Sequence, residues 1–297
     1  MRGLVWNCRG LNSSLAPTSS KLRSMLSMFS YDFIFLMETK CNVVKTAPFC
    51  RPFGYVNYDG VDAIGSSGGL FLAWKKEINI VCMYKCCNFI ICRVHECKDL
   101  FWYLCLVYRA PKASYRERVW DELGVWLESF DKPALLIGDF NQVDFTWDKL
   151  STNTGKIKGA DTFIDWCREQ NLSEIPYKGL KYTWCNNMSG HKRVYERLDK
   201  AYVTENWFSI HHDTGIKHFP IQLSDHAPIE VDTNLVRDKR SRPYKLEAWN
   251  FEYEECLTLI KHQRSINFKG SANFTLMRKL GNVRKALKTW SLDKKQE

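Results

Sequence analysis

Short apolar runs recur along the first 235 residues, and several of them stop at a polar side chain. Residues 31–37 and 134–138 show no alternation of polar and apolar positions, which is typical of strands buried on both faces. Helical periodicity occurs in fewer segments, such as residues 115–130 and 161–170. Because the strands outnumber the helices, a simple strand–helix alternation does not fit. The pattern predicts two sheets packed face to face with helices outside.

Polar residues with complementary chemistry stand at the ends of these runs. They are Asn7, Glu38, Tyr108, Asp139 with Asn141, and Ser224 with Asp225 and His226. A single acid at a strand end says little, because turns use aspartate freely. Strand ends on one rim of a sheet converge even when they are distant in sequence. Several such ends together therefore predict one functional site.

The residue types at these ends suit phosphodiester hydrolysis. A divalent cation held by carboxylates neutralises phosphoryl oxygens, and Glu38, Asp139 and Asp225 are the carboxylates at these strand ends. An aspartate beside an asparagine, as in Asp139 and Asn141, suits the activation of a water molecule. Histidine, asparagine and tyrosine can donate to the developing negative charge. Asp199 is a candidate partner that orients the His226 ring and favours its cation.

The remaining histidines and the cysteines point to structural roles. His211, His212 and His218 are interpreted as surface residues. The chain has 12 cysteines, but their spacing fits no zinc signature. No signal peptide or membrane span is recognised. We therefore expect reduced thiols, a reducing intracellular compartment and no membrane partner.

The positive charge of the chain is concentrated in residues 236–297. The formal net charge is +10, and this segment holds 15 Lys and Arg against 7 Asp and Glu. Residues 1–235 hold 28 against 26, and their apolar content supports a sizeable core. The change predicts a domain over residues 1–235 and a basic extension over residues 236–297. Such an extension suits a polyanion such as nucleic acid, with a solvated helical surface as the alternative.

An apolar stripe runs through the basic extension. It comprises Leu276, Leu280, Val283, Leu287 and Trp290. The 4-3-4-3 spacing of these residues places them on one face of a helix. Because this face needs a cover, we expect it to dock on the body or on a partner segment.

The motifs, taken in order, resemble the endonuclease/exonuclease/phosphatase superfamily over residues 3–235. Within it they are most similar to the endonuclease domain of plant LINE-type (non-LTR) retrotransposon polyproteins. The segments that carry the resemblance are Trp6-Asn7-Cys8-Arg9-Gly10-Leu11, Met37-Glu38-Thr39-Lys40, Ser67-Gly68-Gly69-Leu70, Val107-Tyr108-Arg109-Ala110-Pro111, Gly138-Asp139-Phe140-Asn141, Tyr182-Thr183-Trp184, Arg197-Leu198-Asp199-Lys200 and Ser224-Asp225-His226-Ala227-Pro228.

The resemblance implies a four-layer α/β sandwich and Mg²⁺-dependent nicking of DNA, with Mn²⁺ as a substitute. The catalytic residues that it implies are Asp139, Asn141, His226, Asp199 and Tyr108. The metal ligands that it implies are Glu38, Asp225 and Asn7. The substrate contacts that it implies are Asn7, Tyr108, Thr183, Ser224 and His226. An enzyme that cuts chromosomal DNA is expected in the nucleus.

Two departures refine the resemblance. Arg9 stands where repair-type members carry an acid, which argues against a dedicated repair enzyme. The tail, with Arg242-Pro243-Tyr244-Lys245-Leu246 and Trp249, resembles the segment that precedes reverse transcriptase, so the chain is interpreted as a truncated element. Two alternatives remain open. One is a phosphatase of the same superfamily acting on a small phosphoester, and the other is a non-catalytic nucleic-acid-binding remnant.

Overall fold

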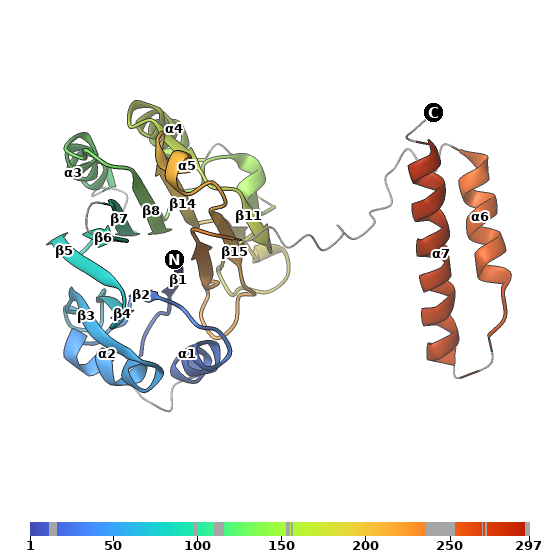
Figure 1. Ribbon diagram of the computed structural model, residues 1–297, viewed down its shortest axis with the longest axis horizontal. Coiled ribbons are helices and arrows are strands. Elements are labelled where there is room, and N and C mark those ends of the chain that lie inside the picture. The colour runs from blue at the N-terminus through green and yellow to red at the C-terminus, as the bar shows by residue number, and fades with distance from the viewer. Residues whose placement is uncertain are drawn as a thin grey trace. The chain divides into compact units, whose positions relative to one another are not determined.

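The computed structural model describes residues 1–11, 17–97, 100–109, 116–152, 155, 157–235, 253–268, 270 and 272–294. The chain divides into two compact units, Met1–Arg237 and Asp238–Glu297. The larger unit contains the sheets, and the smaller unit contains two helices (Figure 1). The basic linker expected near residues 237–243 and the motif at residues 242–249 lie outside the described residues.

The first sheet has seven strands, with the N-terminal strand near its middle (Figure 1). Its order is β11 (Tyr177–Gly179), β15 (Gly215–His218), β16 (Ile229–Asp232), β1 (Arg2–Asn7), β2 (Phe33–Met37), β4 (Leu70–Lys75) and β3 (Tyr55–Val61). Strands β1 and β2 are parallel, with Asn7 opposite Met37, and β16 is antiparallel to β1. The ends of β1 and β2 and the start of β16 therefore meet at one rim.

The second sheet has six strands. Its order is β10 (Leu172–Glu174), β14 (Asp199–Thr204), β8 (Ala134–Asp139), β7 (Phe101–Tyr108), β6 (Phe89–His95) and β5 (Asn79–Lys85). Strands β7 and β8 are parallel, with Tyr108 opposite Asp139. Strand β14 is antiparallel to β8, which places Asp199 opposite Asp139. This sheet therefore also collects polar strand ends at one rim.

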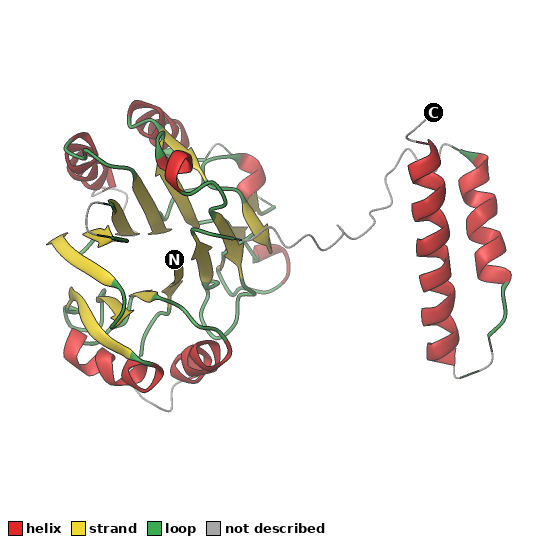
Figure 2. Ribbon diagram, viewed as in Figure 1, coloured by secondary structure: helices red, strands yellow, loops and turns green. Residues whose placement is uncertain are grey.

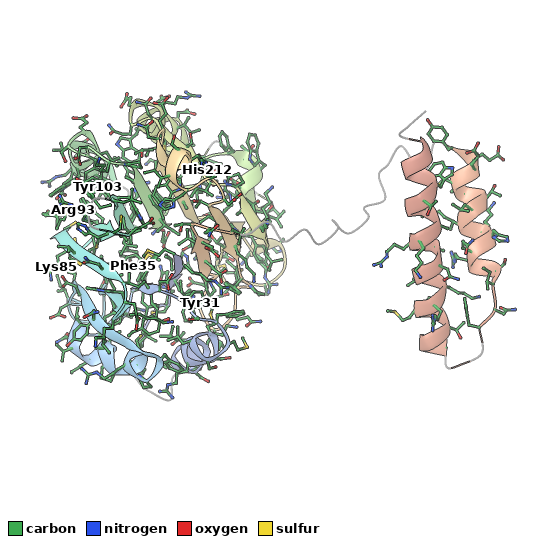
Figure 3. All side chains as sticks on the ribbon, in the orientation of Figure 1. Tyr31, Phe35, Lys85, Arg93, Tyr103 and His212 are labelled. Atoms are coloured by element: carbon green, nitrogen blue, oxygen red, sulfur yellow. The ribbon has the colours of Figure 1, made fainter. Side chains whose placement is uncertain are left out.

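Helices cover the outer face of each sheet, which completes four layers (Figure 2). Helices α1 (Pro17–Met28) and α2 (Val43–Cys50) pack on the first sheet, and α3 (Arg116–Glu128) and α4 (Ala160–Glu169) pack on the second. Side chains between the sheets form a third core, in which Phe35 of β2 is fully buried (Figure 3). The expected α/β sandwich is confirmed.

Short elements connect these layers. They are β9 (Lys149–Leu150), β12 (Trp184–Cys185) and β13 (Tyr195–Glu196), which form a small third sheet, with α5 (Trp207–Ile210), η1 (Arg51–Phe53), η3 (Thr146–Asp148) and η4 (Gly190–Lys192). The sequence predicts a strand over residues 181–184, but only Trp184 belongs to one. The reason is that Thr183 bonds to Glu196 through its N–H and to Ala227 through its carbonyl, so it continues no single ladder.

Two of the three histidines interpreted as surface residues are in fact buried. His212 is exposed, whereas His211 and His218 retain 8% and 3% of their accessible surface. His218 belongs to β15, where its ring stacks on Tyr177 at 4.3 Å between ring centroids. Pairing of β15 with β11 and β16 buries this strand inside the first sheet. The sequence pattern of β15 is too short to reveal that position.

The smaller unit is a helical hairpin of α6 (Glu254–Ser265) and α7 (Ala272–Lys294). Trp290 of α7 donates a hydrogen bond from Nε1 to Glu255 Oε2 of α6, at 3.1 Å. The predicted stripe is covered only at one end of α7. Leu287 is buried, but Leu276 and Leu280 remain 56% and 54% exposed.

The 12 cysteines all have free thiols, and 7 of them are buried. Burial raises the pKa of Cys8 to about 12, so this thiol stays protonated and behaves as a small apolar side chain. Within the described part of the chain, no helix combines the length and the apolar character needed to cross a membrane.

Candidate active site

The polar strand ends of both sheets meet at a single rim. Asn7 and Glu38 come from the first sheet, and Tyr108 and Asp139 come from the second. Asn7 donates from Nδ2 to Asp139 Oδ2 at 3.0 Å and to Glu38 Oε1 at 3.3 Å. The Tyr108 hydroxyl donates to the same Glu38 oxygen at 3.0 Å. These bonds join the two sheets directly and fix the orientation of both carboxylates.

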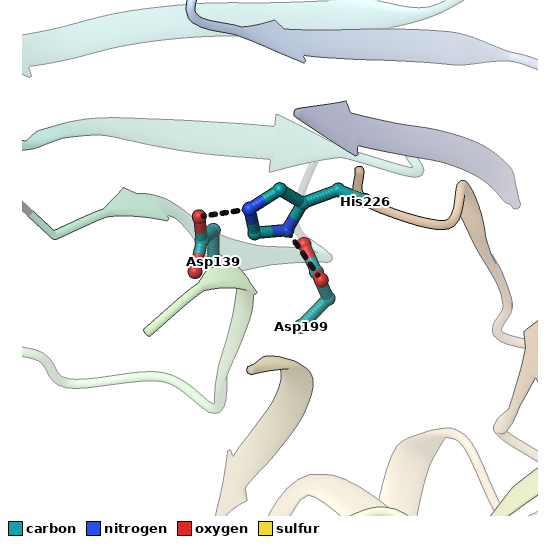
Figure 4. A group of neighbouring side chains, drawn as sticks. All are labelled: Asp139, Asp199 and His226. Carbon is teal, nitrogen blue, oxygen red and sulfur yellow. Dashed lines mark hydrogen bonds and ion pairs between the residues drawn. The ribbon is translucent and has the colours of Figure 1, made fainter. Parts of the chain in front are cut away.

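A buried histidine lies between two aspartates at this rim (Figure 4). His226 Nδ1 donates to Asp199 Oδ2 at 3.0 Å, and His226 Nε2 lies 3.6 Å from Asp139 Oδ2. The register of β14 with β8 brings these aspartates side by side. The His226 ring therefore touches a carboxylate through each nitrogen.

Burial and the charges of this cluster raise the pKa values of Asp139 and His226. Burial raises the pKa of Asp139 to about 6, with His226 opposing the rise and Asp199 adding to it. Burial alone would lower the pKa of His226, but Asp199 and Asp139 together raise it to about 9. At neutral pH His226 is an imidazolium and Asp139 is mostly ionised. A proton acceptor and a proton donor therefore coexist within one cluster.

The backbone is strained at several residues of the site. Arg9, Glu38 and Asn141 have φ angles of 51°, 52° and 45°, which non-glycine residues rarely adopt. Asn141 uses this turn to donate from its N–H to Asp139 Oδ1 at 2.9 Å. Backbone strain of this kind is common at functional sites, so its presence at this rim supports the rim as the candidate site.

Gly138 allows Asp139 to reach the rim. Its φ is 153°, and a Cβ atom at this position would lie 1.8 Å from the carbonyl oxygen of Val107. Only glycine permits strand β8 to approach β7 this closely. The first residue of the Gly138–Asn141 motif is thus required by packing, and it places the carboxylate of the second, Asp139, at the rim.

Two predicted contacts lie behind the cluster. Thr183 is fully buried, and its Oγ1 accepts from the N–H groups of Leu198 and Asp199 at 3.0 and 2.9 Å. The Ser224 hydroxyl donates to the Asn7 carbonyl at 2.8 Å and accepts from the His226 N–H at 3.2 Å. In this arrangement both residues position Asp199, Asn7 and His226.

Arg9 and Trp184 are the contacts that sequence reasoning missed. The Arg9 guanidinium donates a hydrogen bond to Asp225, and its Nε lies 3.5 Å from Glu38 Oε2. Trp184 Nε1 donates to the same Asp225 oxygen at 3.0 Å. Asp225 therefore already has a cation and a neutral donor. The sequence offered Arg9, two positions after Asn7, and Trp184, at the end of the Tyr182–Trp184 motif, but no local pattern linked either residue to Asp225.

The donors at the rim fit a divalent cation. Glu38, Asp139, Asp199 and Asp225 supply four carboxylates, and Arg9 and His226 supply two balancing cations. Asn7 Oδ1 is buried and has no hydrogen-bond partner within the described ranges. A lone amide oxygen beside a carboxylate offers ligands that Mg²⁺ and Mn²⁺ prefer.

A second grouping of potential ligands is less suitable. Ligand atoms of Asp139, Asp199 and His226 lie within 4.8 Å of one another. However, His226 Nδ1 is bonded to Asp199, and His226 Nε2 faces Asp139 Oδ2 at 3.6 Å, so both ring nitrogens already have a carboxylate partner. The edge formed by Glu38 and Asn7 fits a metal better.

Comparison with known proteins gives a family match and several solved structures. The family model described as "Endonuclease/Exonuclease/phosphatase family" matches residues 4–226. No curated protein sequence gives a significant match. The 3′ phosphatase NExo from Neisseria, solved with a product DNA hairpin, is 17% identical, with a TM-score of 0.59 and coverage of 78% of this chain and 98% of that chain.

Two further structures are similar. The endonuclease domain of TRAS1, a telomere-specific non-LTR retrotransposon, is 14% identical, with a TM-score of 0.55 and coverage of 80% and 99%. The AP endonuclease LMAP from Leishmania major is 17% identical, with a TM-score of 0.59 and coverage of 77% and 86%. At such identities the likeness establishes the fold and leaves the substrate open.

Proposed function

Because the chain belongs to the endonuclease/exonuclease/phosphatase family, we propose that it is a metal-dependent endonuclease that nicks DNA. The observation that carries this proposal is the imidazolium of His226, held between Asp199 and Asp139 at a rim with excess negative charge. Such a rim provides a base, an acid and a place for a divalent cation within one small volume. Those are the requirements of in-line attack by water on a phosphodiester.

Asp139 is proposed as the group that orients and deprotonates the attacking water. Its carboxylate is held by Asn7 Nδ2 at 3.0 Å and by Asn141 Nδ2 at 3.2 Å. A pKa of about 6 leaves the carboxylate ionised at neutral pH and more basic than an ordinary aspartate. Asn7 and Asn141 thereby keep one oxygen in place for proton transfer.

His226 is proposed as a donor to the scissile phosphate. Asp199 fixes its tautomer through Nδ1, which leaves Nε2 with its proton at the rim. In the present geometry this proton faces Asp139, 3.6 Å from Oδ2. A phosphate oxygen arriving between them would accept the proton as its negative charge develops.

Glu38 and Asn7 are proposed as the main metal-holding residues, with Mg²⁺ or Mn²⁺ as the ion and Tyr108 as a phosphate contact. When bound, such an ion would neutralise phosphoryl oxygens and stabilise the leaving group. The Tyr108 hydroxyl orients Glu38, and burial raises the Tyr108 pKa, so the hydroxyl keeps its proton. Asp225 also remains a proposed ligand, although in this structure its carboxylate is bound by Arg9 and Trp184.

The biological context is proposed to be a plant LINE-type retrotransposon. The motif order within residues 3–235 supports this, and a non-LTR retrotransposon endonuclease is among the similar structures. On this view residues 1–235 form the nuclease domain, and residues 236–297 begin the region that leads to a reverse transcriptase. The enzyme would act on nuclear DNA. Arg9, in place of an acid, favours this branch over repair enzymes.

Nicking of supercoiled plasmid tests the proposal. We expect the full chain to convert supercoiled DNA to open circles in Mg²⁺, with no conversion in EDTA. Asp139→Asn and His226→Ala should each slow conversion by at least about 10²-fold, because each removes a proton-transfer group. Asp165→Asn, an exposed aspartate on α4, serves as the matched control and should leave the rate unchanged. Equal nicking by all four proteins would reject the proposal.

The same purified chain can distinguish the two alternative functions, a phosphatase and a non-catalytic nucleic-acid-binding remnant. A 3′ phosphatase is among the similar structures, so release of phosphate from a 3′-phosphorylated oligonucleotide is the appropriate second assay. Phosphate release with an intact plasmid would favour the phosphatase. Salt-sensitive DNA binding without either reaction would favour a non-catalytic nucleic-acid-binding remnant.

A further inference from the structure

A cavity of about 640 Å³ lies outside the cluster of catalytic candidates. Its walls come from three segments: the residues after β11, the turn between β12 and β13, and the residues after β15. We call it the tyrosine groove, defined by Lys181, Tyr182, Arg193, Tyr195, Pro220 and Ile221. None of these residues has a role in the chemistry derived for the rim.

The tyrosine groove leads toward the candidate active site. A second cavity, of about 490 Å³, is lined by Arg9, Ser224 and Asp225 of the rim. Both cavities are also lined by Asn187 and Ile221. A ligand that lies across Arg9 and Asp225 can therefore extend into the tyrosine groove past these two shared residues.

Two half-buried aromatic rings form the wall of the groove. The rings of Tyr182 and Tyr195 have centroids 6.0 Å apart and planes inclined by 33°. An aromatic surface held in this way, and still open to a cavity, can stack on a planar ring. Stacking of a nucleobase on tyrosine depends little on which base is present.

Two cations accompany the rings. Lys181 Nζ lies 5.6 Å from the centroid of Tyr182, and Arg193 Nη1 lies 3.5 Å from the Tyr195 hydroxyl oxygen. Arg193 is held by a bond from its Nε to the Met188 carbonyl at 2.7 Å. Among the described residues that line the groove, none is acidic. This combination suits a planar base attached to a phosphate chain better than an apolar peptide or a lipid.

We propose that the tyrosine groove binds one unstacked nucleobase of the DNA, next to the phosphate at the rim. The proposal rests on DNA being the substrate. A cavity of about 640 Å³ accommodates a base with its sugar, since pockets for small ligands begin at roughly 300 Å³. Lys181 and Arg193 contact the flanking phosphates, and Tyr182 and Tyr195 contact the base.

The test compares two DNA duplexes that differ by one base. One carries a single unpaired thymine, and the other carries an abasic residue at the same position. Fluorescence anisotropy in EDTA gives the Kd of each duplex with the full chain carrying Asp139→Asn, a substitution that is expected to slow cleavage. We expect the thymine duplex to bind at least about tenfold more tightly, as the loss of one stacked base predicts. Equal affinities would overturn the proposal.

Tyrosine variants in the same background locate the effect. Tyr182→Ala and Tyr195→Ala should bring the ratio of the two affinities close to one, whereas Tyr182→Phe and Tyr195→Phe should keep it. Tyr58→Ala is the matched control, because β3 is the edge strand opposite β11 in the first sheet. Circular dichroism melting checks that each variant is folded. If Tyr58→Ala lowers the ratio of the two affinities as much as Tyr182→Ala does, the base does not bind in the tyrosine groove.

The two proposals fail in different ways. Nicking of plasmid with equal affinity for the two duplexes would retain the endonuclease and reject the base site. A preference for the thymine duplex, lost in Tyr182→Ala, would support the base site even if no nicking occurred, and the proposed function would then fall. Lys181→Ala and Arg193→Ala should lower the affinity for both duplexes by the same factor and reduce the salt dependence of binding.

Discussion

Two histidines, one in strand β15 and one just before strand β16, are equally buried but differ in charge, since His218 is neutral and His226 is a cation. His226 and His218 retain 4% and 3% of their accessible surface, and each donates from Nδ1 to one oxygen. For His226 that oxygen belongs to the carboxylate of Asp199, whereas for His218 it is the carbonyl of Leu180, at 2.8 Å. Burial lowers the pKa of His218 to about 4, while the aspartates raise that of His226 to about 9.

Burial alone therefore does not decide the charge of these two histidines. The group that accepts the Nδ1 hydrogen bond decides it. A carbonyl dipole holds the His218 ring in place without stabilising its cation enough to offset desolvation. Two carboxylates reverse that balance at His226. The first region is structural and neutral, and the second is charged and adjacent to a solvent-accessible rim.

The test with the largest expected effect replaces the charged partner of His226 with a neutral one, like the carbonyl that holds His218. Asp199→Asn retains the shape of the side chain but removes the charge that stabilises the imidazolium. We expect the nicking rate to fall by about 10³-fold at pH 7, and the His226 pKa, followed by NMR, to fall below its ordinary value. Glu169→Gln, at an exposed acid, is the control. A variant that keeps a raised His226 pKa would show that Asp139 alone holds the proton.

The second test concerns the stability contributed by keeping His218 neutral. Its pKa is about 4 when folded and about 6.5 when unfolded, so between these values only the unfolded chain binds the proton. Stability is fully present above pH 6.5 and falls by about 3 kcal/mol as the pH approaches 4. His218→Gln cannot titrate and should lack this loss, as measured by urea unfolding at pH 7.5 and 4.5.

His212→Gln is the control for this measurement, because His212 is exposed. It should keep the acid-dependent loss of the unmodified chain. An identical loss in His218→Gln would mean that other groups cause the acid sensitivity, and the neutral state assigned to His218 would lose its support.

The third test uses the pH dependence of the nicking rate to follow the protonation of Asp139 and His226. In the proposed reaction Asp139 acts in its ionised form and His226 in its protonated form, so the rate should rise with pH through about 6 and fall through about 9. Outside this window the nicking rate changes about tenfold for each pH unit. Initial rates at constant ionic strength between pH 4.5 and 10.5 give the profile. A rate that keeps rising above pH 9 would exclude His226 as the donor.

The smallest test changes one hydroxyl in each region. Tyr108→Phe removes the donor to Glu38, and we expect about fivefold more Mg²⁺ to be needed for half of the maximal rate. Tyr177→Phe removes the hydroxyl of the ring that stacks on His218 and should leave the Mg²⁺ requirement unchanged. Equal shifts in both variants would mean that the Tyr108 effect is not local to Glu38.

The sequence predicts the layers and most of the rim for a physical reason. Residues 33–37 and 134–139 are buried on every side, so their composition records the strand without reference to the rest of the fold. Strands β1 and β2 are parallel, and so are β7 and β8. The polar residues at the ends of each pair therefore lie side by side as a consequence of the strand pairing alone. Glu38 and Asp139 were therefore within reach of a pattern argument.

Other features depend on contacts that no local pattern encodes. Helix α2 contains Pro48, which obscures its periodicity, and it was not expected. The bond from Arg9 to Asp225 joins residues 216 positions apart in the chain. The tyrosine groove is assembled from segments after two different strands. Such features follow only from the placement of the two sheets.

The pairing of β1 with β16 has a consequence for the order in which the protein can become active during synthesis. Strand β1 contributes Asn7, yet one of its two neighbours is completed only when residue 232 has been made. Until then β1 has an open edge, and His226 has no fixed position beside it. Contacts of such high sequence separation form late and slowly. A nascent chain therefore exposes one edge of β1 before the candidate site is complete, and an unpaired strand edge of this kind is a site where aggregation can begin.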